Sequence, residues 1–166
     1  MTPRPERPLR RRLQARAMRV ANVPMRRALA LPYATPLSRR LMLLFLTGRR
    51  TGRRYRQPVS YVRDGATLLT PGGGKWKLNL AEGRPVRIRL QGRDVSARPE
   101  IVADLDAIER LLAVMTAANP RVRSFVGIAQ DPDGRFDRAQ LETAVRYGFR
   151  VVRWHLDEAD LARLRG

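Results

Sequence analysis

Five arginines and two Thr-Gly pairs crowd into residues 46–58, whose sequence is LTGRRTGRRYRQP. Two of its glycines bracket Arg49, Arg50 and Thr51, so the segment predicts a tight turn with backbone N–H groups beside guanidinium side chains. Phosphate and carboxylate oxygens bind donors of both kinds. The segment therefore predicts an anion-binding turn. It lacks the Gly-Lys-Ser/Thr ending of a nucleotide-hydrolysing loop, and a hairpin with a solvated basic tip is the alternative interpretation.

A second stretch with chemical potential is TPGGGKW, residues 70–76. Three consecutive glycines let a planar ligand approach the backbone, and Trp76 supplies a flat apolar surface. Pro58 adds to this prediction, because a proline inside a strand removes a hydrogen-bond donor and indicates a sheet edge or a bulge. The alternative is a flexible loop followed by a core tryptophan.

Other reactive groups are scarce. The chain has no cysteine, which excludes disulfides, thiolate metal sites and cysteine nucleophiles. His155 is the single histidine and has no partner at metal-ligand spacing, so we expect a structural histidine. The aspartates at 131, 133 and 137 lack the closing glutamate of a calcium loop, and a turn-rich loop explains them better.

The elements that position these residues follow from hydrophobic periodicity. The pattern predicts short antiparallel strands with helices inserted between them, which is typical of an α+β domain built on a small barrel of about six strands. We expect residues 1–36 to form an Arg-rich N-terminal helical extension, with a break or kink at Pro24, and residues 37–166 to form the barrel domain. In this domain the pattern predicts strands near 41–47, 53–63, 66–70, 85–91, 94–102 and 149–156, a helical turn near 75–83, and helices near 104–118, 136–148 and 157–166.

The charge is strongly uneven along the chain. The formal net charge is +19, and residues 1–63 carry 17 arginines and one acid, against 17 basic and 14 acidic residues in 64–166. A high-GC coding bias explains part of this arginine content, but the asymmetry indicates a polyanionic partner. The longest apolar run, residues 41–46, is far shorter than the roughly 20 residues of a membrane-spanning helix. With no secretory signal pattern either, we expect a cytoplasmic protein.

Four segments in fixed order resemble a known family. TGRRTGRRYRQPVSYVRDG, LLTPGGG, KWKLNL and PVRIRLQGR are similar to the deazaflavin (F420)-dependent nitroreductase family of split β-barrel, FMN-binding-like proteins. The resemblance is detailed over residues 41–100. The residues that match the family's pattern are Gly48, Arg50, Thr51, Gly52, Pro58, Gly72, Gly73, Trp76, Asn79 and Leu80.

The resemblance implies that the cofactor is F420, whose phospholactyl and oligoglutamate tail is polyanionic. It implies that Arg50, Thr51 and nearby backbone bind the phosphate while further arginines meet the glutamates, and that residues 70–80 enclose the ring. Hydride transfer to a nitroaromatic, a quinone or an activated alkene, that is, to a small hydrophobic electron acceptor, would follow, with a proton from solvent or Tyr55. The expected cofactor-binding residues are Arg49, Arg50, Thr51, Gly52, Arg54, Arg56, Pro58, Val59, Ser60, Thr70, Gly72, Gly73, Trp76, Lys77, Asn79 and Leu80.

The sequence also departs from this pattern. Tyr55 stands where the family usually has an arginine, and strand parity points the flanking Arg54 and Arg56 to the opposite face. The loop before Trp76 lacks the usual His-Pro, and Lys77 and its neighbour replace a typical Tyr-His. A ring pocket of different shape, or a non-catalytic paralogue, is the alternative that these departures leave open.

Three further alternatives concern partners. A protein of this fold could bind FMN or haem in place of F420. A non-enzymatic basic module could bind anionic lipid or nucleic acid through residues 4–63. For the Arg-rich N-terminus we rank a solvated face packed on a dimer partner first, an anionic membrane at the inner face of the cell second, and nucleic acid third, and the resemblance alone implies a homodimer.

Overall fold

The computed structural model describes residues 21–81 and 83–165. Residues 21–29 are helical. The remaining elements, in chain order, are β1 (Leu41–Thr47), β2 (Arg54–Ser60), β3 (Val62–Asp64), β4 (Thr67–Gly72), the 3-10 helix η1 (Lys75–Asn79), β5 (Val86–Leu90), β6 (Arg93–Val102), α2 (Leu105–Ala118), α3 (Val122–Val126), α4 (Arg138–Arg146), β7 (Arg150–Leu156) and α5 (Glu158–Arg165).

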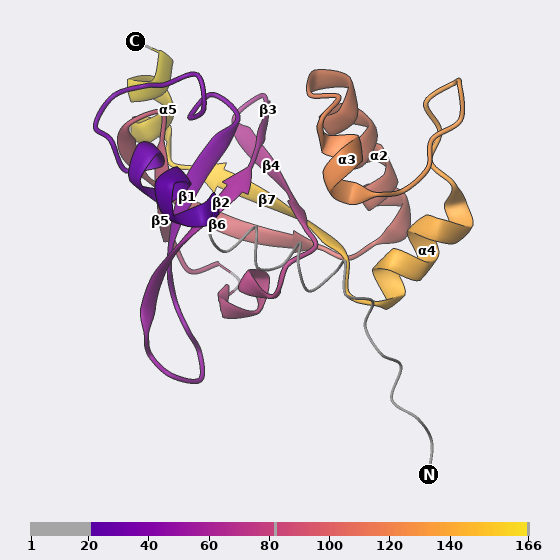
Figure 1. The fold of residues 1–166 in the computed structure, drawn as a ribbon, viewed down its shortest axis with the longest axis horizontal. Helices are drawn as coiled ribbons and strands as arrows, with labels where there is room; N and C mark the ends of the chain where they lie inside the picture. Colours follow the sequence, from indigo (N-terminus) through magenta and orange to yellow (C-terminus); the bar gives the residue numbers. More distant parts are fainter. Residues whose placement is uncertain (1–20, 82, 166) are drawn as a thin grey trace.

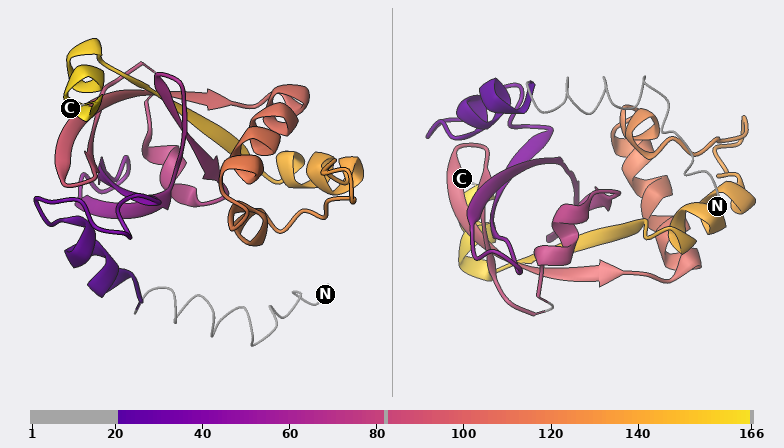
Figure 2. Two further views of the ribbon diagram at one scale, coloured as in Figure 1. Left: turned by 90° about the horizontal axis from the view of Figure 1, so that it is seen from above. Right: turned by 60° about the horizontal axis from the view of Figure 1, so that its bottom comes forward.

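The strands form one antiparallel sheet in the order β2-β1-β5-β6-β7-β4-β3 (Figure 1). The two border strands, β2 and β3, are consecutive in the chain and are separated by Tyr61 alone. The sheet must therefore curl until its two borders meet, and Figure 2 shows this curl from two further directions. The predicted α+β class and split β-barrel are confirmed, with seven strands in place of about six because the second predicted strand bends at Tyr61 into two.

The register of β1 against β2 confirms the predicted alternation of faces. Seven residue pairs join the two strands, from Leu41 with Ser60 to Thr47 with Arg54. Tyr55 and Val59 turn their side chains into the barrel, where they pack against its core. Because β2 borders the sheet, Pro58 lies on an edge strand. An edge strand is the part of a sheet that tolerates a residue without a backbone N–H.

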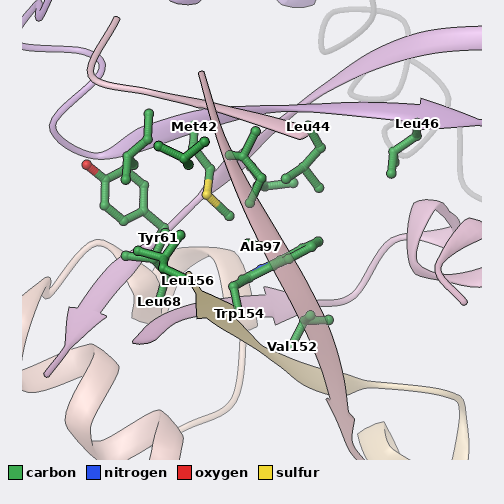
Figure 3. Close-up of a cluster of buried hydrophobic side chains, with 13 residues drawn as sticks. Met42, Leu44, Leu46, Tyr61, Leu68, Ala97, Val152, Trp154 and Leu156 are labelled. Atoms are coloured by element: carbon green, nitrogen blue, oxygen red, sulfur yellow. The ribbon is translucent and has the colours of Figure 1, made fainter. Parts of the chain in front are cut away.

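Two hydrophobic cores lie on opposite faces of the sheet. Successive strand residues point to opposite faces, so Trp154 enters the barrel core and the neighbouring buried valine at 151 enters the other core, beneath the helices. Figure 3 shows the barrel core, in which Trp154 is fully buried beside Met42 and Leu44. Helices α2, α3 and α4 cover the second core and gather at one end of the sheet (Figure 1).

The helix starts follow from their caps. Asp104 accepts a hydrogen bond from the backbone N–H of Ala107 at 2.8 Å, and Asp137 accepts one from Gln140 at 3.0 Å. Each satisfies a donor that the first helical turn leaves free. Both helices begin within two residues of their predicted starts.

The end of the N-terminal helix packs on the outside of the barrel. Leu29 is buried, and the Arg89 guanidinium donates to the carbonyl of Ala30. The predicted break at Pro24 is wrong: the helix runs through it and continues to residue 29, where alanines and arginines favour helix. The predicted helix over residues 9–20 lies outside the described residues, and the domain boundary at residue 36 stays a prediction. No helix of the described part combines the length and apolarity that crossing a membrane requires.

Candidate functional site

The Arg-rich segment forms the turn between β1 and β2. The N–H of Gly48 donates to the Arg53 carbonyl at 2.9 Å, and the N–H of Gly52 donates back to the Gly48 carbonyl at 2.8 Å. Gly52 has a φ of 65°, a left-handed conformation that a side chain disfavours. Within the described residues, the N–H groups of Arg50 and Thr51 have no acceptor. The turn therefore presents two free backbone donors, as the sequence predicted.

Asn79, at the end of η1, connects this turn to the barrel interior. Its Oδ1 accepts from the backbone N–H of Arg49 at 3.0 Å, and its Nδ2 donates to the Tyr55 hydroxyl at 2.6 Å. A backbone N–H can only donate, so the first bond fixes which amide atom faces the hydroxyl. The Tyr55 oxygen consequently acts as an acceptor, and its own proton is left for another partner.

A cleft of about 300 Å³ lies between the turn and η1. We call it the turn cleft. The turn and η1 contribute three basic side chains, an amide, a hydroxyl, one apolar side chain and a glycine to its lining: Gly48, Arg49, Arg50, Thr51, Lys75, Leu78 and Asn79.

A second depression adjoins the turn cleft and shares Gly48 and Thr51 with it. We call it the Arg26 groove. Its volume is about 460 Å³, and Arg26 reaches it from the N-terminal helix. The Arg26 Nε is buried and has no hydrogen-bond partner in the described part of the chain. An unpaired buried donor is costly, so the groove suits an anionic ligand that would satisfy it. The remaining lining residues are Arg53, Arg54, Tyr55 and Arg56.

The arginines of the turn have no acidic partner in the part of the chain that the structure describes. Among residues 21–81 and 83–165, none of the five between positions 49 and 56 forms an ion pair with an acid. On the outer face, Arg56 and Arg87 instead lie over the ring of Phe45, at 5.6 and 3.9 Å from its centroid. The guanidinium groups are therefore available to oxyanions.

The glycine loop after β4 is shaped largely by its own neighbours. A Cβ at Gly72 would come within 2.9 Å of the Arg150 carbonyl oxygen, and one at Gly74 within 2.6 Å of the Trp76 ring. Only Gly73 faces open space, with its nearest neighbour at 3.9 Å. Two of the three glycines are therefore explained by packing within the chain.

The Lys77 side chain contacts this loop. Its Nζ donates to the Gly74 carbonyl at 2.9 Å, and its stem lies beside Gly72. Burial, with a smaller contribution from the nearby Arg150 charge, lowers the pKa of the Lys77 ammonium. Lys77 thus supports the loop and is not one of the residues that line the turn cleft.

Trp76 belongs mainly to the barrel core. Its ring stacks on that of Trp154, with centroids 6.4 Å apart and an angle of 14° between the planes. Thr70 also has a structural partner, because its hydroxyl accepts from the Trp154 indole N–H at 3.1 Å. Neither residue lines the two depressions at the turn.

The structure divides the predicted site residues into two groups. Arg49, Arg50, Thr51, Arg54, Tyr55, Arg56 and Asn79 meet at the turn. The residues that do not line either depression there are Gly52, Pro58, Val59, Ser60, Thr70, Gly72, Gly73, Trp76, Lys77 and Leu80. Sequence reasoning missed Arg26, Arg53, Lys75 and Leu78. Arg53 lies in the Arg-rich turn, and Lys75 and Leu78 lie in the predicted helical turn, so these three could have been found, whereas Arg26 depends on how the N-terminal helix docks.

Comparison with known proteins identifies the family to which the chain belongs. Residues 12–127 match the model of a family described as F420H(2)-dependent quinone reductase. No curated protein sequence matches the chain.

Three solved structures resemble the chain at low identity. A structure of an F420-H2 dependent reductase has a TM-score of 0.46 and 14% identity over 70% of this chain and 94% of that one. A chain described as a domain-swapped dimer has a TM-score of 0.48 and 14% identity over 83% and 98%. A FAD-binding protein from Mesorhizobium loti has a TM-score of 0.42 and 15% identity over 72% and 82%.

The family match covers more than half of the sequence, including the turn, η1 and the strands that position them. The chain belongs to the F420H2-dependent quinone reductase family, a family of oxidoreductases whose cofactor is F420.

Proposed function

We propose that the chain binds F420 with its acidic tail across the turn cleft and the Arg26 groove, and reduces a small hydrophobic acceptor. The observation that carries the proposal is the meeting, at one turn, of five arginines and the buried Arg26 Nε, none of which has an acidic or hydrogen-bonding partner, respectively, among the described residues. A ligand with a phosphate and several carboxylates would satisfy this group of donors. The residues present therefore fit the tail of F420.

Two kinds of donor would share the tail. The N–H groups of Arg50 and Thr51 have no acceptor in the described chain, and successive N–H groups of a turn suit a phosphate. The guanidinium groups of Arg53, Arg54 and Arg56 extend the same positive surface along the Arg26 groove, where successive carboxylates would lie. This assignment accounts for the replacement of the family's usual arginine by Tyr55. Four other arginines line the groove with it: Arg26, Arg53, Arg54 and Arg56.

The bound deazaflavin supplies the hydride when it is reduced. The chain's own residues would orient the cofactor and the acceptor and would supply a proton. Asn79 holds the turn and Tyr55 in fixed relation through two hydrogen bonds. Because the Tyr55 oxygen already accepts from Asn79, its hydroxyl proton can be donated to a ligand bound next to Tyr55. Tyr55 is accordingly our candidate proton donor, with solvent as the other source.

The acceptor that we propose is a quinone, a nitroaromatic or an activated alkene. These compounds accept a hydride at an electron-poor carbon or nitrogen and then need one proton, which matches the single donor proposed. Assays with menadione, a nitroimidazole and a cyclic enone would distinguish them, because each reports on one class.

The decisive experiment is a titration of the purified protein with F420, followed by fluorescence. We expect saturable binding at micromolar concentrations and a steep loss of affinity as salt rises, since exposed ion pairs are screened. Absence of saturable binding at micromolar protein would contradict the proposal. Retention of full affinity when Arg49 and Arg50 are both replaced would contradict the assignment of the site.

Association with an anionic membrane is a second, separate proposal. In the described part of the N-terminal helix and the following connector, Val23 and Tyr33 are exposed at 52% and 59%, and the same segment carries Arg26 and Arg27. Apolar and basic side chains together favour an anionic lipid surface. Cosedimentation with phosphatidylglycerol vesicles, but not with phosphatidylcholine vesicles, is the expected result.

We also propose a homodimer. Two large side chains on the helical side of the sheet, Phe125 and Tyr147, are exposed at 59% and 85%. Aromatic side chains of this kind are enriched in interfaces between protein chains. Light scattering should give twice the monomer mass, and a double Phe125→Ser and Tyr147→Ser variant should give the monomer mass.

A further inference from the structure

A second basic pocket lies at the other end of the β1–β2 hairpin. It is bounded by the residues that precede β1, by the bend at Tyr61 between β2 and β3, by the turn between β5 and β6 and by the end of α2. Its volume is about 500 Å³. We call it the bend pocket; its lining residues are Arg39, Arg40, Tyr61, Val62, Arg63, Leu90, Gln91, Ala118, Asn119 and Pro120.

The bend pocket is separate from the turn cleft. The β1–β2 ladder begins at the pair Leu41 and Ser60, next to the pocket, and ends at the pair Thr47 and Arg54, next to the turn. Six steps of about 3.3 Å along a strand place the two sites about 20 Å apart. No residue lines both sites.

Three guanidinium groups surround the bend pocket. Arg39, Arg40 and Arg63 are exposed, and none forms an ion pair with an acid in residues 21–81 and 83–165. They come from two segments that only the fold brings together. Three like charges around one opening repel each other, so an oxyanion placed between them is attracted by all three.

The floor of the bend pocket is polar at one point and apolar around it. The Tyr61 hydroxyl donates to the Ser38 carbonyl at 3.1 Å and accepts from the Gln91 Nε2 at 3.0 Å. Figure 3 shows this hydroxyl at the margin of the barrel core. Burial raises the pKa of the Tyr61 hydroxyl, which keeps it protonated and neutral. The floor thus holds a fixed polar contact and carries no negative charge that would oppose an anion.

Gln91 lines the pocket from the hairpin turn between β5 and β6. Leu90 pairs with Arg93, so Gln91 and Gly92 are the two central residues of this turn, and both have a positive φ, of 48° and 81°. A two-residue hairpin requires this conformation at both positions. The turn thus fixes Gln91 where its side chain reaches the Tyr61 hydroxyl at the pocket.

We propose that the bend pocket binds a small organic oxyanion, a carboxylate or a phosphate monoester carried on an apolar body. The three arginines bind the oxyanion, and the apolar walls formed by Leu90, Ala118 and Pro120 contact the body. A volume of about 500 Å³ accommodates a compact molecule of this kind, since small-ligand pockets start near about 300 Å³.

The test uses phenyl phosphate, benzoate and inorganic phosphate as probes of the full chain. The side-chain N–H signals of the arginines are followed by NMR, and the affinity is measured by calorimetry. We expect the signals of Arg40 and Arg63 to shift in a saturable way, with phenyl phosphate or benzoate bound at least tenfold more tightly than inorganic phosphate. Which of the two organic anions binds more tightly identifies the head group.

A double variant, Arg40→Gln and Arg63→Gln, should weaken this binding at least tenfold and leave the affinity for F420 unchanged. The matched control, Arg49→Gln and Arg50→Gln, should do the reverse. Equal affinity for the organic anion and for inorganic phosphate would overturn the proposal, as would shifts confined to the turn arginines of the unsubstituted protein. The two arms separate this site from the F420 site, so either proposal can fail alone.

Discussion

Two arginine-rich regions of the molecule use the same side chain in opposite ways. On the helical side, Arg138 contacts three carboxylates: Asp106 and Glu109 at 2.6 and 2.5 Å, and Glu142 at 3.7 Å. The hydrogen bonds that Arg138 donates to Asp106 and Glu109 raise the pKa of its guanidinium. At the β1–β2 turn, the arginines meet no acid in the described chain.

The difference shows how structural and ligand-binding arginines can be separated in a chain with a large excess of positive charge. A guanidinium surrounded by carboxylates links two helices, α2 and α4, whereas a guanidinium beside free backbone donors is available to an external anion. The count of arginines does not make this distinction. The four predictions below test it, beginning with the largest expected effect.

The sharpest test replaces charge in both regions. Arg49→Gln with Arg50→Gln should lower the affinity for F420 by roughly 100-fold or more, because each lost charge-assisted hydrogen bond costs about 1.5–3 kcal/mol. Arg138→Gln removes a charge of the same type far from the turn and should leave that affinity unchanged. Fluorescence titration of both variants provides the measurement. Equal losses in the two would mean that F420 responds only to net charge.

The glycine loop and the turn cleft predict different roles for two neighbours in η1. Trp76→Ala should lower the free energy of unfolding by about 2 kcal/mol, since a half-buried ring stacked on Trp154 is lost. Leu78→Ala should change stability by less than about 0.5 kcal/mol, because Leu78 is 51% exposed, and should weaken F420 binding. Denaturant unfolding and F420 titration of both variants would check this. A stable Trp76→Ala variant that loses F420 would instead place the indole in the site.

The Asn79 link predicts an effect of intermediate size. Asn79→Leu removes both hydrogen bonds and should weaken F420 binding about tenfold, as expected for roughly 1–2 kcal/mol. Asn79→Asp keeps an acceptor for the Arg49 N–H but loses the donor to the Tyr55 hydroxyl. Its new carboxylate also opposes the acidic tail in the turn cleft, so turnover is measured at saturating F420. If Tyr55 is the proton donor, the pH dependence of this turnover should shift. An unchanged pH profile in Asn79→Asp would point to solvent as the proton source.

The smallest effect concerns the paired side of the comparison. The hydrogen bond from His155, and more weakly the charge of Arg153, lower the pKa of Glu100 below its ordinary value of 4.5. A lowered folded-state pKa stabilises the fold above the ordinary value, and this stability is lost as the pH falls through the folded-state value. Glu100→Gln should therefore cost a few tenths of a kcal/mol near neutral pH, as for exposed pairs, and progressively less as the pH falls below 4.5. Thermal unfolding across this range is the measurement; a difference that grows at low pH would contradict it.

Much of the fold could be predicted because local signals agreed with one another. The alternation in β5 placed Ile88 and Leu90 inside the barrel, and both are buried there. The Asp64-Gly65 signal correctly located the hairpin between β3 and β4. The alternation could not predict the bend at Tyr61. Side chains keep alternating between the two faces of the sheet where the chain passes from β2 at one border to β3 at the other.

The candidate site was predictable only in part. The turn residues were identified from glycine spacing and charge, which are local. The packing of Trp76 against the barrel core could not be predicted, because its stacking partner, Trp154, lies in a strand far along the chain. The Arg26 groove and the bend pocket likewise depend on side chains that distant segments contribute.

The single-residue joint at Tyr61 constrains how this gene can vary. Side chains on either side of the joint alternate between barrel and exterior, so inserting or deleting one residue there would exchange the two faces of β3. Val62 would leave the helix-covered core and Arg63 would be driven into it, a burial of unpaired charge that the fold could not tolerate. We therefore expect natural variants of this chain to differ in length at the outer loops and to keep this joint constant in length.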